Sequence, residues 1–341
     1  MPQWPYPDNG IPGPLKKRIA VTAAAVLSAL LTSRGDAVRA DDYPSHPVKL
    51  VLPQPAGGAV DLIARALADR FTEQMRTPVV VENMPGANGS LAAGTVARAA
   101  PDGYTLMLAV DSNLVINPGL YHNLSYDPFR DFVPISIIAR LYMVLVANPK
   151  VDANNVRELI AYARAHPNKL NYASIGLGTA MHMGMELFKF ATGTEINQVS
   201  YRGTAQAVTD VVAGIVDVML TGPPSARSMA EGGRLKLLAV ASPDRMALMP
   251  DVPTMQEAGV PGYEMASWFG LLAPARTPSA IVERLSQEVR RAIADRKFGE
   301  RMKAQGLETV GGTPEAMLLT MQADTEKWAK LIKASGIEIP Q

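Results

Sequence analysis

The chain has 341 residues, with 33 Lys and Arg against 32 Asp and Glu, four His and no Cys. Its length suggests two domains, and 48% of apolar residues with a mean hydropathy of only +0.05 excludes both a disordered chain and a polytopic membrane protein. A net charge of +1 provides no basic surface for nucleic acid, and the absence of Cys excludes disulfides, thiolate metal sites and cysteine nucleophiles.

The first forty residues have the features of a secretory signal peptide. Three basic residues at 16–18 precede an apolar run at 19–31, and a small-residue cleavage site follows at 38–40. The alternative is a membrane anchor, but this run is too short to span about 30 Å of hydrocarbon. Cleavage after Ala40 removes a leader of net charge +3 and leaves 301 residues of net charge −2. We therefore expect an exported protein.

The remaining chain alternates short apolar strands with amphipathic helices, which predicts an α/β fold with mainly parallel sheets. In chain order, we expect strands at 48–53, 79–81, 105–109, 171–173, 216–220 and 235–241. We expect helices at 61–75, 90–99, 155–166, 180–192, 205–213, 278–295 and 314–334. Two apolar crossings, at 133–147 and around 268–273, bracket the middle of the chain. This order predicts a discontinuous first lobe, 44–141 plus 265–341, and an inserted second lobe, 142–264.

Each half of the chain contains a Gly-rich loop that runs directly from a strand into a helix. The candidate binding residues in these loops are Pro55, Ala56, Gly57, Gly58 and Asp61 in the first half and Gly176, Gly178, Thr179 and His182 in the second. Such loops present unpaired backbone N–H groups at the positive end of a helix dipole, which favours an anion. Two facing loops would clamp a carboxylate. The alternative for either loop is an ordinary turn in which Asp61 or Thr179 caps the helix.

No motif in the chain indicates catalysis or a bound cofactor. There is no phosphate loop, the second Gly-rich loop lacks the third glycine of a dinucleotide site, and no G-x-S-x-G elbow occurs. The four histidines are not spaced four residues apart in any pair, which leaves a metal site without support. Only Asp61, Asp111 and His182 remain as acid or base candidates. We therefore expect no enzyme activity, no cofactor and no metal.

Motifs along the whole chain point to a known family. In order, they are Pro55-Ala56-Gly57-Gly58-x-x-Asp61, Val81-Glu82-Asn83-x-Pro85-Gly86-Ala87-x-Gly89-Ser90, Pro101-Asp102-Gly103-Tyr104-Thr105, Asn117-Pro118-x-Leu120-Tyr121, Tyr126-Asp127-Pro128, Asp131-Phe132, Gly176-x-Gly178-Thr179-x-x-His182, Tyr201-Arg202-Gly203, Pro250-Asp251-Val252-Pro253-Thr254, Glu257-Ala258-Gly259 and Trp268-x-Gly270-Leu271-x-Ala273-Pro274. This ordered set covers about 44–340 and resembles the Bug family, the TctC-like substrate-binding proteins of tripartite tricarboxylate transporters.

The resemblance implies a periplasmic binding protein of type II, in which two α/β lobes close on a central cleft like a Venus flytrap. It implies that the two Gly-rich loops hold the carboxylate of a small organic acid through backbone N–H groups and bridging waters. It also implies delivery of the acid to the permease subunits of a tripartite tricarboxylate-type transporter. We expect a monomer with no nucleic-acid partner. A sensor lobe for an organic acid and, less favoured, an acid-processing enzyme are the alternatives.

Four further residues are candidates for the ligand site. Tyr201 and Arg202 follow a strand at the edge where open α/β sheets bind ligands, and Arg202 is either the cation for a distal carboxylate or a surface residue. Asp111 and Ser112 stand where the resembling family more often has small and hydroxyl residues. Asp111 would repel a second ligand carboxylate unless it meets an ammonium or a protonated group, and its alternative is a solvated turn. The identity of the acid does not follow from the sequence.

Overall fold

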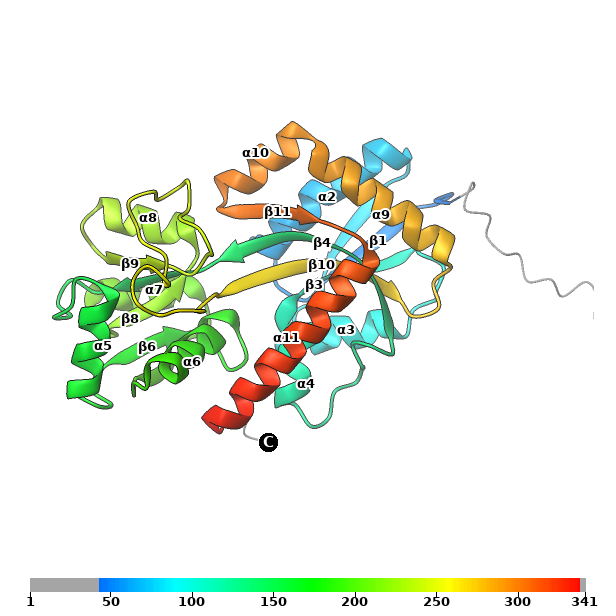
Figure 1. Ribbon diagram of the computed structural model, residues 1–341. Coiled ribbons are helices and arrows are strands. Elements are labelled where there is room, and N and C mark those ends of the chain that lie inside the picture. Colours follow the sequence, from blue (N-terminus) through cyan, green and yellow to red (C-terminus); the bar gives the residue numbers. More distant parts are fainter. Residues whose placement is uncertain (1–42, 338–341) are drawn as a thin grey trace, which may run out of the picture. The chain divides into compact units, whose positions relative to one another are not determined.

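Two β-sheets, each flanked by helices, make up the part of the chain that the computed structural model describes, residues 43–337 (Figure 1). The signal peptide predicted for 1–40 lies outside the described residues. The strands are β1 (Val48–Leu52), β2 (Val79–Asn83), β3 (Thr105–Val110), β4 (Phe132–Tyr142), β5 (Val144–Ala147), β6 (Asn171–Ser174), β7 (Asn197–Ser200), β8 (Val218–Thr221), β9 (Lys236–Val240), β10 (Ala266–Pro274) and β11 (Leu307–Gly311). The expected α/β class with two sheets is confirmed.

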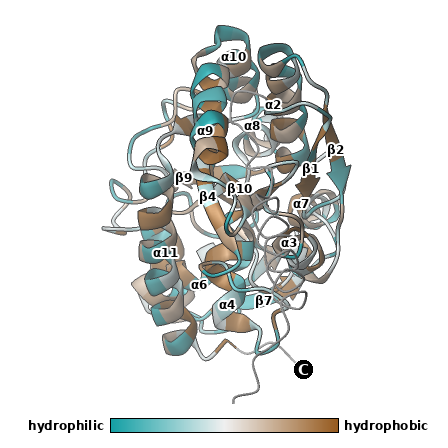
Figure 2. Cartoon of the chain, turned by 90° about the vertical axis from the view of Figure 1, so that its right-hand side faces the viewer, coloured by the Kyte–Doolittle hydropathy of each residue, from teal (hydrophilic) through white to brown (hydrophobic). Residues whose placement is uncertain are grey.

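The helices that cover these sheets begin and end close to the expected positions. They are α2 (Ala59–Met75), α3 (Ser90–Ala97), α4 (Asn117–Leu120), α5 (Val156–Ala165), α6 (Ala180–Thr192), α7 (Thr204–Ala213), α8 (Pro223–Glu231), α9 (Ser279–Ala294), α10 (Arg296–Ala304) and α11 (Pro314–Ser335), with a 3₁₀ turn η2 (Ala87–Gly89) and a π-helical turn η3 (Ser112–Ile116). Figure 2 shows their hydrophilic faces turned outward from the apolar strands. In α2, for example, Ile63, Leu67 and Phe71 recur at a spacing of four residues and are all buried.

Both sheets are mixed, so the expectation of mainly parallel sheets is wrong. The first has the order β11-β4-β10-β3-β1-β2 and the second β7-β6-β8-β5-β9. Parallel pairing joins β1 to β2 and β3, and β6 to β7 and β8. The other pairs, which involve β4, β5 and β10, are antiparallel. The reason is that the chain crosses from the first sheet to the second and returns, so that the crossing strands β4 and β10 pair in opposite directions.

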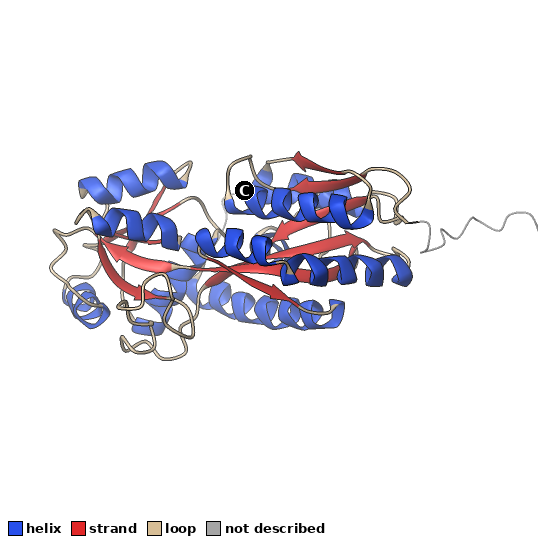
Figure 3. Cartoon of the chain, turned by 90° about the horizontal axis from the view of Figure 1, so that it is seen from above, coloured by secondary structure: helices blue, strands red, loops and turns tan. Residues whose placement is uncertain are grey.

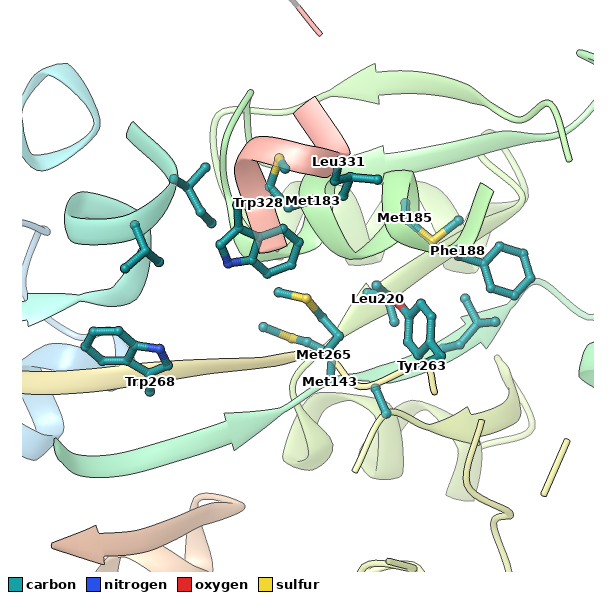
Figure 4. Close-up of a cluster of buried hydrophobic side chains, with 14 of the residues drawn as sticks. Met143, Met183, Met185, Phe188, Leu220, Tyr263, Met265, Trp268, Trp328 and Leu331 are labelled. Atoms are coloured by element: carbon teal, nitrogen blue, oxygen red, sulfur yellow. The ribbon is translucent and has the colours of Figure 1, made fainter. Parts of the chain in front are cut away.

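The crossings meet at two methionines that no strand includes. The expected single crossing at 133–147 is divided at Met143, where β4 ends and β5 begins, and Met143 N donates to Met265 O at 3.1 Å. Figure 3 shows the long strands running from one sheet toward the other. In Figure 4, Met143 and Met265 lie beside Trp328 of α11 and Met183 of α6, all of them buried. The apolar core is therefore continuous through the crossing, although the lobe boundaries at 141/142 and 264/265 stay a prediction.

Several elements were not expected from the sequence. The strands β7 and β11 are partly exposed and polar, α8 begins with two prolines, and η3 with α4 is a π-helical turn followed by a single α-helical turn. Short edge strands and irregular turns carry too little periodicity to be recognised. This matters for function because η3 and α4 lie directly after β3, at the edge of the first sheet that carries the candidate ligand loops.

Candidate functional site

The candidate loops follow the carboxyl ends of the parallel strands. The first Gly-rich loop, 53–58, follows β1, and the second, 175–179, follows β6. Close approach between the two halves of the chain is visible at Gly178, where an added Cβ would lie only 2.7 Å from Leu120 Cδ1 of α4. The same Cβ would be 3.5 Å from the side-chain amide nitrogen of Asn88. The structure therefore brings the second loop against η2 and α4 of the first half.

The first loop is shaped by Asp61. Gly57, at φ +92°, donates its backbone N–H to Asp61 Oδ2 at 3.1 Å, and Arg65 binds both carboxylate oxygens at 2.9 and 3.0 Å. Asn83 Nδ2 donates to Asp61 Oδ1 at 3.1 Å. The Arg65 guanidinium, helped by Gly57 and Asn83 and opposed by burial, lowers the pKa of Asp61 to about 2. Asp61 is thus a permanent anion that holds the loop, and its bonds are to the protein itself.

The first loop otherwise has the expected form. Pro55, Ala56, Gly57 and Gly58 are exposed, and Gly58 precedes α2 in an extended conformation without a side-chain cap. Helical bonding begins with Leu62 N to Gly58 O at 3.0 Å. The N–H groups of the residues between Gly58 and Leu62 therefore have no acceptor among the described helical bonds. The alternative in which Asp61 caps the helix in the ordinary way is wrong, because Asp61 is a residue of the helix and bonds back to Gly57.

The second loop is built in the same way around His182. Gly178, at φ +73°, donates its backbone N–H to His182 Nδ1 at 3.2 Å, and Thr179 Oγ1 donates to Gly176 O at 2.8 Å. Thr179 is the residue before α6, but its side chain makes no capping bond. His182 is 2% exposed, and burial lowers its pKa. The second loop thus also offers free helix N–H groups, and its histidine is neutral.

The third candidate segment lies beside the second loop. Tyr201 N donates to Ser174 O at 2.8 Å, which continues the parallel pairing of β7 with β6 past the strand ends. Burial, with Asp210 as hydrogen-bond partner, raises the pKa of Tyr201 to about 12. Arg202 is exposed and forms no ion pair or hydrogen bond within 43–337. The structure therefore places Arg202 at the edge of the second sheet that carries the second Gly-rich loop, as an unpaired surface cation.

Asp111 and Ser112 occupy a different environment from the loops. Asp111 is 2% exposed and Ser112 is 6% exposed, so the alternative of a solvated turn is wrong. Asp111 Oδ1 accepts from Ser267 Oγ of β10 at 2.7 Å. Burial raises the pKa of Asp111 to about 7, against the opposing effect of hydrogen bonds from Ser267, Ser112 and Trp268. Asp111 joins the end of β3 to a crossing strand, and its contact with a ligand stays a prediction.

Sequence reasoning missed a set of asparagines that complete this edge. Asn88 O accepts from Asn113 Nδ2 at 2.7 Å and from Asn117 Nδ2 at 3.1 Å, while Asn88 Nδ2 donates to Asn117 Oδ1 at 2.8 Å. These bonds hold a turn at 86–89 in which all four φ angles are positive, including those of Ala87 and Asn88. Such backbone strain in non-glycine residues is typical of functional sites. The asparagines themselves were the signal available in the sequence, since Asn tolerates positive φ angles and its side chain forms hydrogen bonds with the backbone.

A cavity of about 200 Å³ lies between the first loop and this turn. Its lining residues are Pro53, Gln54, Pro55, Pro85, Gly86, Asn88, Gly89 and Asn113. The lining offers amide donors and acceptors and proline rings, with no charged side chain. A larger cavity of about 580 Å³ lies between the 242–248 segment and β11, but no predicted site residue lines it. The smaller cavity is the one that residues of the first Gly-rich loop line.

Within 43–337, the chemistry offered is that of binding. No group of three or more His, Asp or Glu side chains is arranged to hold a metal ion, and no helix there is long and apolar enough to cross a membrane. Asp61 is ionised and bonded, His182 uses Nδ1 to hold a backbone N–H, and Asp111 is bonded to a crossing strand. The free groups at the edge are the backbone N–H donors of the two uncapped helix N-termini and the Arg202 guanidinium, which suit a small anion.

The chain is similar to proteins of one known family. The profile of the tripartite tricarboxylate transporter family receptor (TctC) matches residues 63–337. The UPF0065 protein in the tcbD-tcbE intergenic region of Pseudomonas sp. strain P51 is 39% identical over 91% of this chain and 92% of its own.

Three solved structures share the fold. R. palustris Rpa4515 with adipate has a TM-score of 0.79 and 36% identity over 87% of this chain and 99% of its own. The periplasmic binding protein BugD has a TM-score of 0.75 and 36% identity over the same shares. MatC from Rhodopseudomonas palustris with bound malate has a TM-score of 0.75 and 30% identity over 85% of this chain and 100% of its own. The chain thus belongs to the Bug/TctC family of periplasmic solute-binding proteins.

Proposed function

We propose that this chain is a periplasmic receptor that closes two lobes, 44–141 plus 265–341 and 142–264, on a small organic carboxylate. The observation that carries the proposal is the pair of Gly-rich loops, each followed by a long helix, α2 or α6, without a side-chain cap. A carboxylate accepts hydrogen bonds from such free N–H groups and is stabilised by the helix dipole. The carboxylates in related structures, adipate and malate, support the ligand class.

The receptor binds its ligand without converting it, in our proposal. The three acid or base candidates are all engaged: Asp61 with Arg65, His182 with Gly178 and Asp111 with Ser267. We further propose that the loaded receptor delivers the acid to the permease subunits of a tripartite tricarboxylate-type transporter, because its family serves such transporters. Uptake of labelled acid should then be lost when either the receptor or the permease is deleted. Uptake that persists without the receptor would contradict this role.

Ligand binding is tested by a thermal-shift screen of the purified protein. Malate, adipate, succinate, citrate, glutamate and benzoate are compared with neutral sugars and with simple cations. A ligand at about 100 times its Kd stabilises the folded state by about 2.7 kcal/mol, which is readily measured. Stabilisation by one or more acids supports the proposal. Stabilisation by sugars or cations alone would overturn it. The binding acid, recovered unchanged after prolonged incubation, would support a receptor over an enzyme.

A matched set of glycine substitutions tests the loops. Gly57 (φ +92°), Gly176 (φ +118°) and Gly193 (φ +60°) all have positive φ and open space where a Cβ would stand, but Gly193 lies at the distal end of α6. Gly57→Ala and Gly176→Ala should weaken binding of the acid at least tenfold, because a Cβ hinders close approach to the backbone. Gly193→Ala places an alanine at φ +60°, in the left-handed region that it adopts with less strain, and should bind like the wild type. Equal affinity in all three variants would remove the loops from the site.

A further inference from the structure

The Gly-rich loops and the cavity of about 580 Å³ lie on opposite sides of the crossing strands. In the first sheet, β4 and β10 have β3 and β1 on one side and β11 on the other, and in the second sheet β5 lies between β8 and β9. The loops follow β1 and β6, whereas the cavity is lined by β11 and by 242–248, the segment after β9. In Figure 1, α8 and α10 lie above the long strands, and α4 and α6 lie below them. We call this space behind the crossing the rear cavity.

The two walls of the rear cavity belong to different lobes. Segment 242–248 and Arg227 of α8 form the wall of the second lobe, and Gly299, Lys303 and 306–309 form the wall of the first. Among the described residues, no ion pair and no hydrogen bond joins one wall to the other, and the Lys303 side chain has no such partner at all. The separation of the walls is therefore not fixed by polar contacts across the cavity.

The lobes do touch beside the rear cavity, close to the crossing. A Cβ added at Gly306, between α10 and β11, would lie 3.0 Å from Cβ and Cγ of Pro223 and 3.2 Å from Cδ of Pro224, the first residues of α8. The next residue, Leu307, pairs with Leu141 near the end of the crossing strand β4. Proline rings have little freedom to move aside. This contact therefore has the position and the stiffness of a fulcrum.

The ligand side of the crossing is closed in this structure. A Cβ added at Gly178 of the second loop would lie only 2.7 Å from Leu120 Cδ1 of α4, so the two lobes meet there as well. Two lobes that turn about a crossing approach each other on one side as they separate on the other. Opening of the ligand side therefore brings the walls of the rear cavity together.

We propose that the rear cavity controls ligand affinity, because it is the space that the lobes close up when the ligand side opens about the contact of Gly306 with Pro223. This inference rests on the proposed function, in which the lobes close on a ligand. A receptor whose binding-competent state is only partly populated has an apparent affinity that is reduced by that fraction. A group that fills the rear cavity opposes opening, and it therefore raises the affinity without contacting the ligand.

A matched pair of substitutions at Gly299 tests this proposal. Gly299 lines the rear cavity from α10, and no atom lies within 4 Å of the position that a Cβ would take. Gly299→Trp places an indole ring in the cavity, whereas Gly299→Ala removes the same helix glycine without filling the space. Lys297→Trp adds the ring to the same helix at an exposed residue that does not line the cavity.

The probe is the acid that gives the largest thermal shift in the panel, titrated by calorimetry. We expect Gly299→Trp to bind it at least about threefold more tightly than Gly299→Ala, and Lys297→Trp to bind like the wild type. Binding by Gly299→Trp that is equal to or weaker than that of Gly299→Ala would overturn the proposal. Ala247→Trp fills the same cavity from the wall of the second lobe and should also tighten binding. It decides the question if thermal melts show that Gly299→Trp does not fold.

A distance measurement tests the motion itself. The chain has no cysteine, so spin labels can be placed at Ser228→Cys of α8 and Lys297→Cys of α10, two exposed residues outside the cavity lining. The distance between the labels, measured by pulsed electron paramagnetic resonance, should lengthen when the acid binds. A distance that shortens or stays the same would overturn the inference.

The same labels separate this inference from the proposed function. Without ligand, the distance between the labels should be longer in Gly299→Trp than in Gly299→Ala, because the indole ring keeps the walls apart. If no acid in the panel binds the wild type, the proposed function fails, and these ligand-free distances still decide whether the rear cavity sets the angle between the lobes. Equal distances in the two variants would overturn the inference even if an acid binds.

Discussion

Asp61 and Asp111 follow neighbouring strands of the first sheet, and both are buried, yet their carboxyl groups are held in opposite states. Asp61 meets a bidentate arginine, a backbone N–H and an amide, and its pKa falls to about 2. Asp111 meets a serine hydroxyl and two backbone N–H groups but no described cation, and its pKa rises to about 7. Burial alone therefore does not decide the charge of a carboxyl group at this edge. The presence of a cation within hydrogen-bonding distance decides it.

The contrast has opposite consequences for stability. Asp61 has a folded-state pKa below its ordinary value, so it stabilises the fold above about pH 4, and this contribution is lost as the pH falls toward 2. Asp111 has a raised folded-state pKa, so the fold binds a proton that the unfolded chain has released. Its stability contribution is present below pH 3.8 and is lost as the pH rises through about 7. The two residues thus limit the pH range in which the fold is most stable, Asp61 at its acidic end and Asp111 at its basic end.

The largest expected effect comes from Asp111→Asn. Asparagine resembles the protonated carboxyl group and can still accept from Ser267, so the cost of holding a buried charge at high pH disappears. The free energy of unfolding at pH 8 should increase by on the order of 3 kcal/mol, with little change at pH 4. Urea unfolding at several pH values measures this. A variant that is less stable than the wild type at pH 8 would mean that the carboxylate is needed in its charged form.

The next effect is expected from Asp61→Ala. This variant removes the acceptor for Gly57 N–H, Asn83 Nδ2 and Arg65, so the loop loses its anchor. We expect a loss of about 2 kcal/mol in the free energy of unfolding at pH 7, as is typical for hydrogen bonds to a charged group. The loss should shrink toward pH 2, where the wild-type carboxylate is also protonated. If the loss of stability does not change with pH, it is caused by lost packing and not by the loss of the charged group.

A smaller effect is expected from Ser267→Ala, which removes the hydroxyl donor to Asp111. The loss should be about 1 kcal/mol at pH 5, where the carboxyl is protonated, and larger at pH 8, where the bond is to a charged group. Since the serine bond lowers the pKa of Asp111, its removal should raise that pKa further. Carboxyl-carbon NMR titration measures the shift. An unchanged pKa would show that the backbone N–H groups of Ser112 and Trp268 oppose the effect of burial on Asp111 without help from Ser267.

Much of this arrangement was predictable from the sequence, because it depends on regular elements. The strand β1, the helix α2 and the Gly-rich turn between them follow from a short apolar run, a helical periodicity and paired glycines. The same signals locate β6 and α6, whose predicted bounds 180–192 agree with the structure. The loops thus belonged to the part of the fold that local patterns determine.

The partners of the site residues could not be predicted in this way. Asp111 accepts a hydrogen bond from Ser267, which lies 156 residues later in the chain. Asn88 accepts hydrogen bonds from Asn113 and Asn117, from which it is separated in the chain by α3 and β3. These contacts depend on the antiparallel crossing strand β10 and on the irregular turns η2 and η3, which carry no periodic signal. The pairing of Asp61 with Arg65 is local, four residues apart on one helix, and was readable. The charge of Asp61 is therefore easier to predict from sequence spacing than that of Asp111, although the sequence analysis above did not predict it.

The smallest effect is expected from Arg65→Gln, which addresses the cause of the contrast directly. Arg65 is half exposed and water screens its charge, so its removal should change stability at pH 7 only slightly. The pKa of Asp61 should rise by an amount that matches this small loss of stability, at most about one unit, because the guanidinium is the largest cause of the lowered pKa. Carboxyl-carbon NMR titration of Asp61, with Arg70→Gln as a control on the same helix, measures this. If the pKa of Asp61 stayed near 2 without Arg65, the backbone N–H and the amide would account for the charged state, and the cation would not be the feature that separates Asp61 from Asp111.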